Sequence, residues 1–146
     1  MSIAYTLKIM HGYTGTQSPG PNADAIIRAH LETLRIEDHC IIDGLNRDMD
    51  ARIGRMAYAM GFKVLGILPW NRSKIAPDYE RWCYQVYEMP PGTTYMQRND
   101  EIIRLSDILT AFPRTAVEEL RSGTWATIRR GWKKRIPVEI IPVGGI

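Results

Sequence analysis

The sequence alternates between short apolar segments and longer segments whose apolar residues recur at helical spacing. Five short segments, rich in branched and aromatic residues, are strand candidates: 5–10, 40–42, 63–68, 108–112 and 138–141. Four longer segments between them are helix candidates: 23–34, 53–60, 96–105 and 124–134. This alternation is typical of βαβ units, in which helices cover both faces of a parallel sheet. We therefore expect an α/β fold, a three-layer sandwich with a mostly parallel central sheet of about five strands.

The length and composition predict one globular domain, residues 1–146. Hydrophobic residues make up 45% and charged residues 24%, which excludes a disordered chain. No apolar run approaches the roughly 20 residues that span a bilayer, and the first residues lack the features of a signal peptide. Cys40 and Cys83 lie far apart without metal-ligand spacing, which argues against a zinc site and a disulfide framework. We expect a cytoplasmic protein without membrane attachment or bound metal.

Residues 112–125 combine the end of a strand with the start of a helix. An apolar segment leads into a polar loop that ends at Ser122, Gly123 and Thr124, directly at the helix candidate. The first turn of a helix has unpaired N–H groups and the positive end of the helix dipole, so this position favours an anion such as phosphate. Ser and Thr are also common N-cap residues, and plain capping is the alternative interpretation.

Positive charge is concentrated around the same helix. The chain has a net charge of +3, and residues 121–135 contain six basic and no acidic residues, so the remainder is net −3. The six are Arg121, Arg129, Arg130, Lys133, Lys134 and Arg135. One interpretation is an electropositive surface for the phosphate groups of a nucleotide or a nucleic acid. The other is a solvated helix face whose cations suit the C-terminal end of the dipole.

Four loops follow strand candidates and are the expected places for a ligand: 11–21, 43–50, 69–73 and 113–124. In open parallel sheets, ligands bind beyond the carboxyl ends of the strands, where the strand order reverses. The loop 11–21 is rich in small residues that allow a close approach of the backbone. Residues 72–94 mix charges, aromatics and a Pro-Pro-Gly turn, and we interpret them as an irregular crossing with a short helix and a short strand.

Three blocks of the sequence resemble one superfamily. They are DGLNRDMDARIGRMAYAMGFKV at 43–64, QRNDEIIRLSDILTAF at 97–112 and RSGTWATIRRGWKKRIPVEII at 121–141. They resemble, in that order, the Gly-rich turn with its acidic residue and helix, the Arg-Asn helix, and the Gly-Thr phosphate loop of the SLOG superfamily. This superfamily includes DNA-processing protein A, the LOG-type cytokinin-activating phosphoribohydrolases and small YspA-like nucleotide-binding proteins. The resemblance covers roughly residues 40–141 and implies a Rossmann-like fold.

The resemblance also implies how a nucleotide-type ligand would bind. Ser122, Gly123 and Thr124 would hold a phosphate with backbone N–H and hydroxyl groups. Arg98 would clamp phosphate, and Asn99 would contact the sugar or base. A solvated arginine and a local cap are the alternative interpretations of these two side chains.

Further residues are implied to lie around the ligand. Gly44 belongs to the Gly-rich turn, and Asp50 would either bond a ribose hydroxyl or cap the following helix. His11 and Gly12 occupy the exit loop of the first strand, where the superfamily places a ligand contact. Trp70 would either stack on a base or close the core, and the core position is favoured.

The sequence departs from the LOG-type pattern at Thr127. The hydrolases have a catalytic Glu at this position, and a hydroxyl cannot replace a carboxylate as a general base at neutral pH. We therefore expect no catalytic residue and no cofactor. The resemblance then implies a homo-oligomeric protein that senses or sequesters a nucleotide-derived molecule, such as an ADP-ribose-like or cyclic nucleotide immune signal in antiphage defence, including the sponges that some phages encode.

Two other functions stay open. One is a nucleoside 5′-monophosphate N-glycosidase in which another carboxylate replaces the missing Glu. The candidate carboxylates are Asp43, Asp50, Glu118 and Glu119. The other function is single-stranded DNA binding through the basic residues 121–135 together with Trp125 and Trp132.

Overall fold

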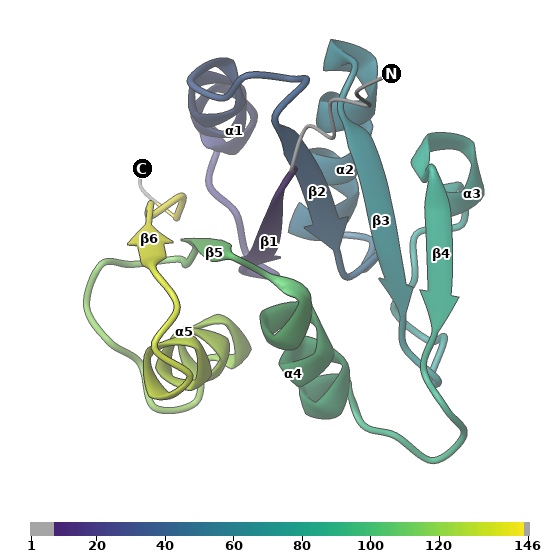
Figure 1. Cartoon of the computed structure of the whole chain (residues 1–146). Coiled ribbons are helices and arrows are strands. Elements are labelled where there is room, and N and C mark those ends of the chain that lie inside the picture. The colour runs from purple at the N-terminus through teal and green to yellow at the C-terminus, as the bar shows by residue number, and fades with distance from the viewer. Residues whose placement is uncertain (1–7, 145–146) are drawn as a thin grey trace.

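The computed structural model describes residues 8–144 and contains a six-stranded sheet (Figure 1). The strands are β1 (Ile9–Gly15), β2 (His39–Asp43), β3 (Lys63–Leu68), β4 (Gln85–Glu88), β5 (Ile108–Phe112) and β6 (Val138–Ile140). They lie in the order β4-β3-β2-β1-β5-β6, and every neighbouring pair is parallel. The predicted α/β fold with a parallel sheet is confirmed.

Helices cover both faces of the sheet and complete the three layers (Figure 1). The helices are α1 (Ala23–Glu32), α2 (Met49–Met60), α3 (Tyr79–Trp82), α4 (Tyr95–Leu105) and α5 (Gly123–Lys133). Alternation along β2 shows how the two faces are built. Ile41 belongs to the larger core under α1, α2 and α3, whereas its neighbour Ile42 packs with Ile67 and Ile102 under α4. Both faces of the strand are buried at its centre, which is why Cys40, Ile41 and Ile42 form an apolar run.

β1 lies later in the chain than the sequence predicted. We expected a strand at 5–10 and a loop from His11, and residues 5–7 of that range lie outside the described part. The cause of the error is two glycines within the strand. A Cβ at Gly12 would overlap the Ser106 hydroxyl, and one at Gly15 would lie 2.6 Å from Met49 Cβ. These glycines allow α4 and α2 to pack closely on the strand, so the exit loop starts only at residue 16.

The segment 72–94 contains a short helix and a short strand, α3 and β4. β4 forms one edge of the sheet and pairs with β3, with Leu65 opposite Gln85. Its sequence, QVYE, is mostly exposed. An edge strand of this kind lacks the apolar pattern that marks the central strands, which explains why its bounds were not predictable.

The order of the strands places a reversal at the carboxyl end of β1. From β1 the chain builds β2, β3 and β4 outward on one side, and α4 then returns it to β5 on the other side. In doubly wound sheets, the crevice at such a reversal is where ligands bind. The loops that leave β1 and β5 and the first turns of α2 and α5 border this crevice.

Candidate ligand-binding cleft

A cleft of about 540 Å³ opens at this reversal, a size that suits a small-molecule ligand. Its walls come from the end and exit loop of β1, the first turns of α2 and α5, one face of α4 and the loop after β5. Its charged lining residues are Asp48, Asp50, Lys74, Arg98, Arg114, Glu119 and Arg121. Cations therefore outnumber acids in the lining, which favours an anionic ligand.

The N-terminus of α5 contributes free backbone donors to the cleft. Ser122 is the N-cap residue, and its hydroxyl accepts a hydrogen bond from the Trp125 N–H at 3.1 Å. The N–H groups of Gly123 and Thr124 donate to no other residue among those described. A Cβ at Gly123 would meet nothing within 4 Å. Free donors and the positive end of the helix dipole thus face open space, an arrangement that suits a phosphate oxygen.

Arg98 is the buried cation of the cleft, with 2% of its surface exposed. Its Nη1 donates to the Gly44 carbonyl, and its Nε donates to Asn99 Oδ1 at 2.9 Å. Its Nη2 makes no hydrogen bond to any residue between 8 and 144. Burial lowers the pKa of Arg98 while Asp50 and Asp43 raise it, and a guanidinium stays protonated in proteins. A fixed guanidinium with unused N–H groups matches phosphate geometry.

Asn99 joins Arg98 to the first residue of α5. Its Nδ2 donates to Thr127 Oγ1 at 3.0 Å, and Thr127 Oγ1 donates in turn to the Gly123 carbonyl at 3.0 Å. Thr127 is buried and does not line the cleft. The position that holds the catalytic Glu in LOG-type hydrolases is therefore occupied here by a side chain that orients Asn99.

Two buried carboxyl groups lie next to the arginine. Asp50 Oδ2 accepts the N–H of Asn46 at 3.1 Å, and Asp43 Oδ2 has no hydrogen-bond partner among the described residues. Burial raises the pKa of both groups, well above the usual range for Asp43, while Arg98 opposes the rise. The N-cap residue of α2 is Asp48, so Asp50 braces the preceding turn and does not cap the helix as one interpretation held.

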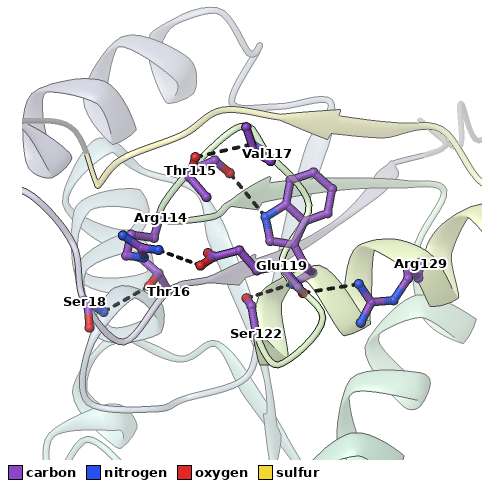
Figure 2. A network of polar contacts seen from close by, with 9 residues as sticks. Thr16, Ser18, Arg114, Thr115, Val117, Glu119, Ser122 and Arg129 are labelled. Carbon is purple, nitrogen blue, oxygen red and sulfur yellow. Dashed lines mark hydrogen bonds and ion pairs between the residues drawn. The ribbon is translucent and has the colours of Figure 1, made fainter.

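The loop between β5 and α5 carries two ion pairs, and Figure 2 shows the one between Arg114 and Glu119. Arg114 Nη2 lies 2.5 Å from Glu119 Oε2, and both residues line the cleft. On the other side of the loop, Arg129 Nη1 lies 2.9 Å from Glu118 Oε2 and donates to the Glu119 carbonyl at 3.4 Å. The loop is thus held to α5 from behind, while the Glu119 side chain faces Arg114 in the cleft.

Most of the residues predicted to bind a ligand lie at the cleft. Those that line it are Asp50, Arg98, Asn99, Ser122, Gly123 and Thr124. Gly44 lies behind Arg98 and holds it through its carbonyl. His11 and Gly12 lie inside β1 and not in an exit loop: the His11 ring stacks on Tyr13, and Gly12 faces α4. Trp70 is 52% exposed, so its predicted core position is wrong, and it does not line the cleft either.

The sequence analysis did not single out several residues that line the cleft. Residues 14–18 and Arg114 fall within the loops 11–21 and 113–124 that it named for a ligand, but none of them was chosen as a binding residue. Lys74 and Tyr95 lie outside all four loops. A signal existed for Arg114, which follows the carboxyl end of β5 by two positions and therefore lies where strand exits border the crevice.

Most of the basic segment 121–135 lies away from the cleft. Of its six basic residues, only Arg121 lines the cleft in the described part of the chain. Four others line a separate groove between α4 and α5: Arg129, Arg130, Lys133 and Lys134. Trp125, considered above for stacking on DNA, is buried, and its Nε1 donates to the Thr115 carbonyl at 3.2 Å. It is therefore not available as a stacking platform.

The described part of the chain shows no group of three or more His, Cys, Asp or Glu side chains arranged to hold a metal ion. Every helix within residues 8–144 is too short or too polar to span a bilayer.

No protein-family model matches the sequence, and no curated protein matches it either. Solved structures do match. DNA processing protein A from Streptococcus pneumoniae matches with a TM-score of 0.73 and 18% identity, over 92% of this chain and 50% of that one. The same protein from Helicobacter pylori matches with a TM-score of 0.71 and 20% identity, over 92% and 65%. The molybdenum cofactor binding protein from Rippkaea orientalis gives a TM-score of 0.72 and 16% identity, over 94% and 78%.

The strand order and the cleft define a Rossmann-like domain with its crevice at the reversal beside β1. The fold is similar to that of DNA processing protein A and of the molybdenum cofactor binding protein, and it is the Rossmann-like fold that the three sequence blocks implied. The chain spans half the length of the S. pneumoniae protein.

Proposed function

We propose that this protein binds a nucleotide-derived small molecule in the cleft and holds it without turnover. The observation that carries this proposal is a set of donors without acceptors: Arg98 Nη2 and the N–H groups of Gly123 and Thr124 all belong to residues that line one cleft. None of these donors has a protein acceptor among the described residues, so solvent or a ligand must accept from them. A phosphate group would satisfy these donors with charge-assisted hydrogen bonds.

The remainder of the ligand would lie along α4 and the first turn of α2. The Asn99 amide already bonds Arg98 and Thr127, so we assign it a positioning role. Tyr95 and Asp50 line the cleft beside it and are placed to contact a sugar or base. The H. pylori protein is described by its single-stranded DNA binding and the R. orientalis protein by its molybdenum cofactor. Trp132, the other aromatic considered for DNA binding, is 47% exposed, but four of the six basic residues of 121–135 line a groove outside the cleft. A small ligand, such as an ADP-ribose-like or cyclic nucleotide, therefore fits the cleft itself better than a polynucleotide.

The candidate general bases at the cleft support the absence of turnover, because each of them is already bonded to another group of the protein. Thr127, at the position of the catalytic Glu in LOG-type hydrolases, is buried and bonded to Asn99. Glu119 is paired with Arg114, and Asp50 accepts a backbone N–H. In the cleft without ligand, both carboxylates are therefore engaged by groups of the protein.

Gly123→Asp tests the phosphate position directly. A Cβ added at Gly123 meets no atom within 4 Å, so a side chain has room there, and the carboxylate would place a negative charge beside the phosphate position. An acidic residue in the first turn also suits the helix dipole, so the fold is retained. With AMP as the probe, isothermal titration calorimetry should show binding to the wild type and about 100-fold weaker binding to Gly123→Asp, because like charges repel.

Gly123→Asn is the matched control, since it adds the same shape without the charge and should keep AMP affinity within about fivefold. Chromatography of the recovered nucleotide should return intact AMP. Equal AMP affinity in the Asp and Asn variants would contradict the phosphate position, and release of free adenine would replace the binding function with a glycosidase.

A further inference from the structure

The ion pair between Arg114 and Glu119 lies inside the cleft, next to the proposed phosphate position. Its two side chains line the cleft together with Ser122, Gly123 and Thr124. Glu119 is also linked to the start of α5, because its carbonyl accepts the Ser122 N–H at 3.4 Å. Figure 2 shows Glu119 reaching toward Arg114 beside Thr16 and Ser18, at the exit of β1. A carboxylate thus occupies an anion position within one turn of the helix N-terminus.

This pair is easily displaced. The Arg114 side chain is 55% exposed and that of Glu119 is 31% exposed. Exposed ion pairs contribute little to stability, since water screens the attraction and both side chains lose freedom. A phosphate offers a guanidinium more acceptor oxygens and more charge than a carboxylate, and Arg binds it in a bidentate manner.

We propose that Arg114 forms a second anion subsite and that the ligand is a nucleotide with two adjacent phosphate groups, a diphosphate. One phosphate lies at α5 against Gly123, Thr124 and Arg98, and the next lies at Arg114, where it takes the place of the Glu119 carboxylate. This inference rests on the proposed function and narrows its ligand class. Glu119 acts as the anion that Arg114 holds while the site is free.

The loop between β5 and α5 carries the candidate residues for the second subsite. The bond from Arg129 to the Glu119 carbonyl holds the backbone of Glu119 from the α5 side, so the side chain can leave Arg114 while the loop stays in place. Arg121 also lines the cleft, and it forms no ion pair with the residues described. It is the competing candidate for the second phosphate and is therefore included in the test.

Inorganic phosphate and pyrophosphate are suitable probes because they require no knowledge of the base. Calorimetry on the full chain should show that the wild type binds pyrophosphate at least about tenfold more tightly than phosphate. Arg114→Gln should reduce this ratio to about threefold or less while phosphate affinity stays within about twofold. Glu119→Gln should tighten pyrophosphate binding about threefold or more, because it removes the competing carboxylate.

Arg130→Gln is the matched control. It removes the same charge from a pair of similar geometry, with Asp100, that lies outside the cleft, and should leave the ratio unchanged. The inference is overturned if Arg114→Gln keeps the wild-type ratio of pyrophosphate to phosphate affinity. It is also overturned if Arg121→Gln reduces this ratio and Arg114→Gln does not. If the wild type binds neither phosphate, pyrophosphate nor AMP, the proposed function is overturned as well. A wild type that binds AMP while Arg114→Gln keeps the ratio overturns the second subsite alone. Circular dichroism verifies that each variant is folded.

Discussion

At the scale of single residues, Gly44 is where the site leaves no room for a side chain. A Cβ there would lie 2.8 Å from Asp50 Oδ2 and 2.9 Å from Arg98 Cζ. We expect Gly44→Ala to displace the guanidinium, to weaken AMP binding at least about tenfold and to lower the free energy of unfolding by about 1–3 kcal/mol. Calorimetry measures the first effect, and urea denaturation measures the second.

Gly54→Ala provides the comparison for Gly44→Ala. Gly54 lies in α2, where a Cβ would overlap the Trp82 ring, and neither residue lines the cleft. This variant should lose about 1–3 kcal/mol of stability and bind AMP as the wild type does. If Gly44→Ala also binds AMP normally, the position of Arg98 does not depend on Gly44.

Residues whose position at the cleft follows from local sequence were predictable. Ser122 to Thr124 could be placed because N-capping and free N–H groups depend on adjacent residues only. Arg98 and Asn99 could be placed from a short motif on one helix. The pairing of Arg114 with Glu119 could not, because it depends on the path of an irregular loop.

At the scale of elements, α4 and α5 are connected through the site. Hydrogen bonds run from Arg98 through Asn99 and Thr127 to the Gly123 carbonyl. The chain of bonds therefore links the buried guanidinium on α4 with the free N–H groups that begin α5. The Thr127 hydroxyl thus connects two groups that we propose to bind the ligand.

Thr127→Val tests this connection. The variant keeps the side-chain shape but leaves the Asn99 amide without its acceptor, which should lower the free energy of unfolding by about 1–3 kcal/mol. We also expect AMP binding to weaken about three- to tenfold, because the hydrogen bonds that connect Asn99 on α4 to the Gly123 carbonyl on α5 are lost. Thr127→Ser retains the hydroxyl and should restore most of the affinity. Normal AMP binding by Thr127→Val, measured by calorimetry, would show that the hydroxyl serves stability alone.

The bounds of buried strands were easier to predict from the sequence than those of exposed strands. The bounds of β3 and β5 match the sequence prediction because these strands are central and apolar. β1 was displaced because Gly12 and Gly15 resemble loop residues, although close packing of helices requires them. β4 was foreseen only as a short strand of unknown bounds, since an exposed edge strand has no alternating apolar pattern.

At the scale of the whole molecule, a buried polar network holds the strands together beneath α1, and the chain's three histidines belong to it. His11 on β1 places Nε2 at 2.6 Å from Thr110 Oγ1 on β5 and Nδ1 at 3.3 Å from His39 Nδ1 on β2. These residues are far apart in the sequence, so only the strand order brings them together. This is why the sequence analysis placed His11 in a ligand-binding loop.

The network continues through the third histidine on α1. His30 Nε2 lies 2.7 Å from the Tyr13 hydroxyl, and His30 Nδ1 lies 3.1 Å from Glu139 Oε1 on β6. Strands from both sides of the reversal, together with α1, are therefore joined by histidines, whose ordinary pKa lies close to neutral pH.

Burial, the largest cause, together with the neighbouring His30 and His39 lowers the pKa of His11 from 6.5 to about 3. Burial also lowers the pKa of His30 and His39, although Glu139 opposes the shift of His30. The folded protein thus binds fewer protons than the unfolded chain below pH 6.5, so stability that is fully present above this pH is lost as the pH falls toward 3. We expect the free energy of unfolding to decrease by up to about 1.4 kcal/mol per pH unit for each histidine that stays neutral. Urea denaturation across this range measures the slope, and NMR of the imidazole carbons assigns it. A His11 ring that titrates near its ordinary pKa in the folded protein would show that the network does not exclude the proton.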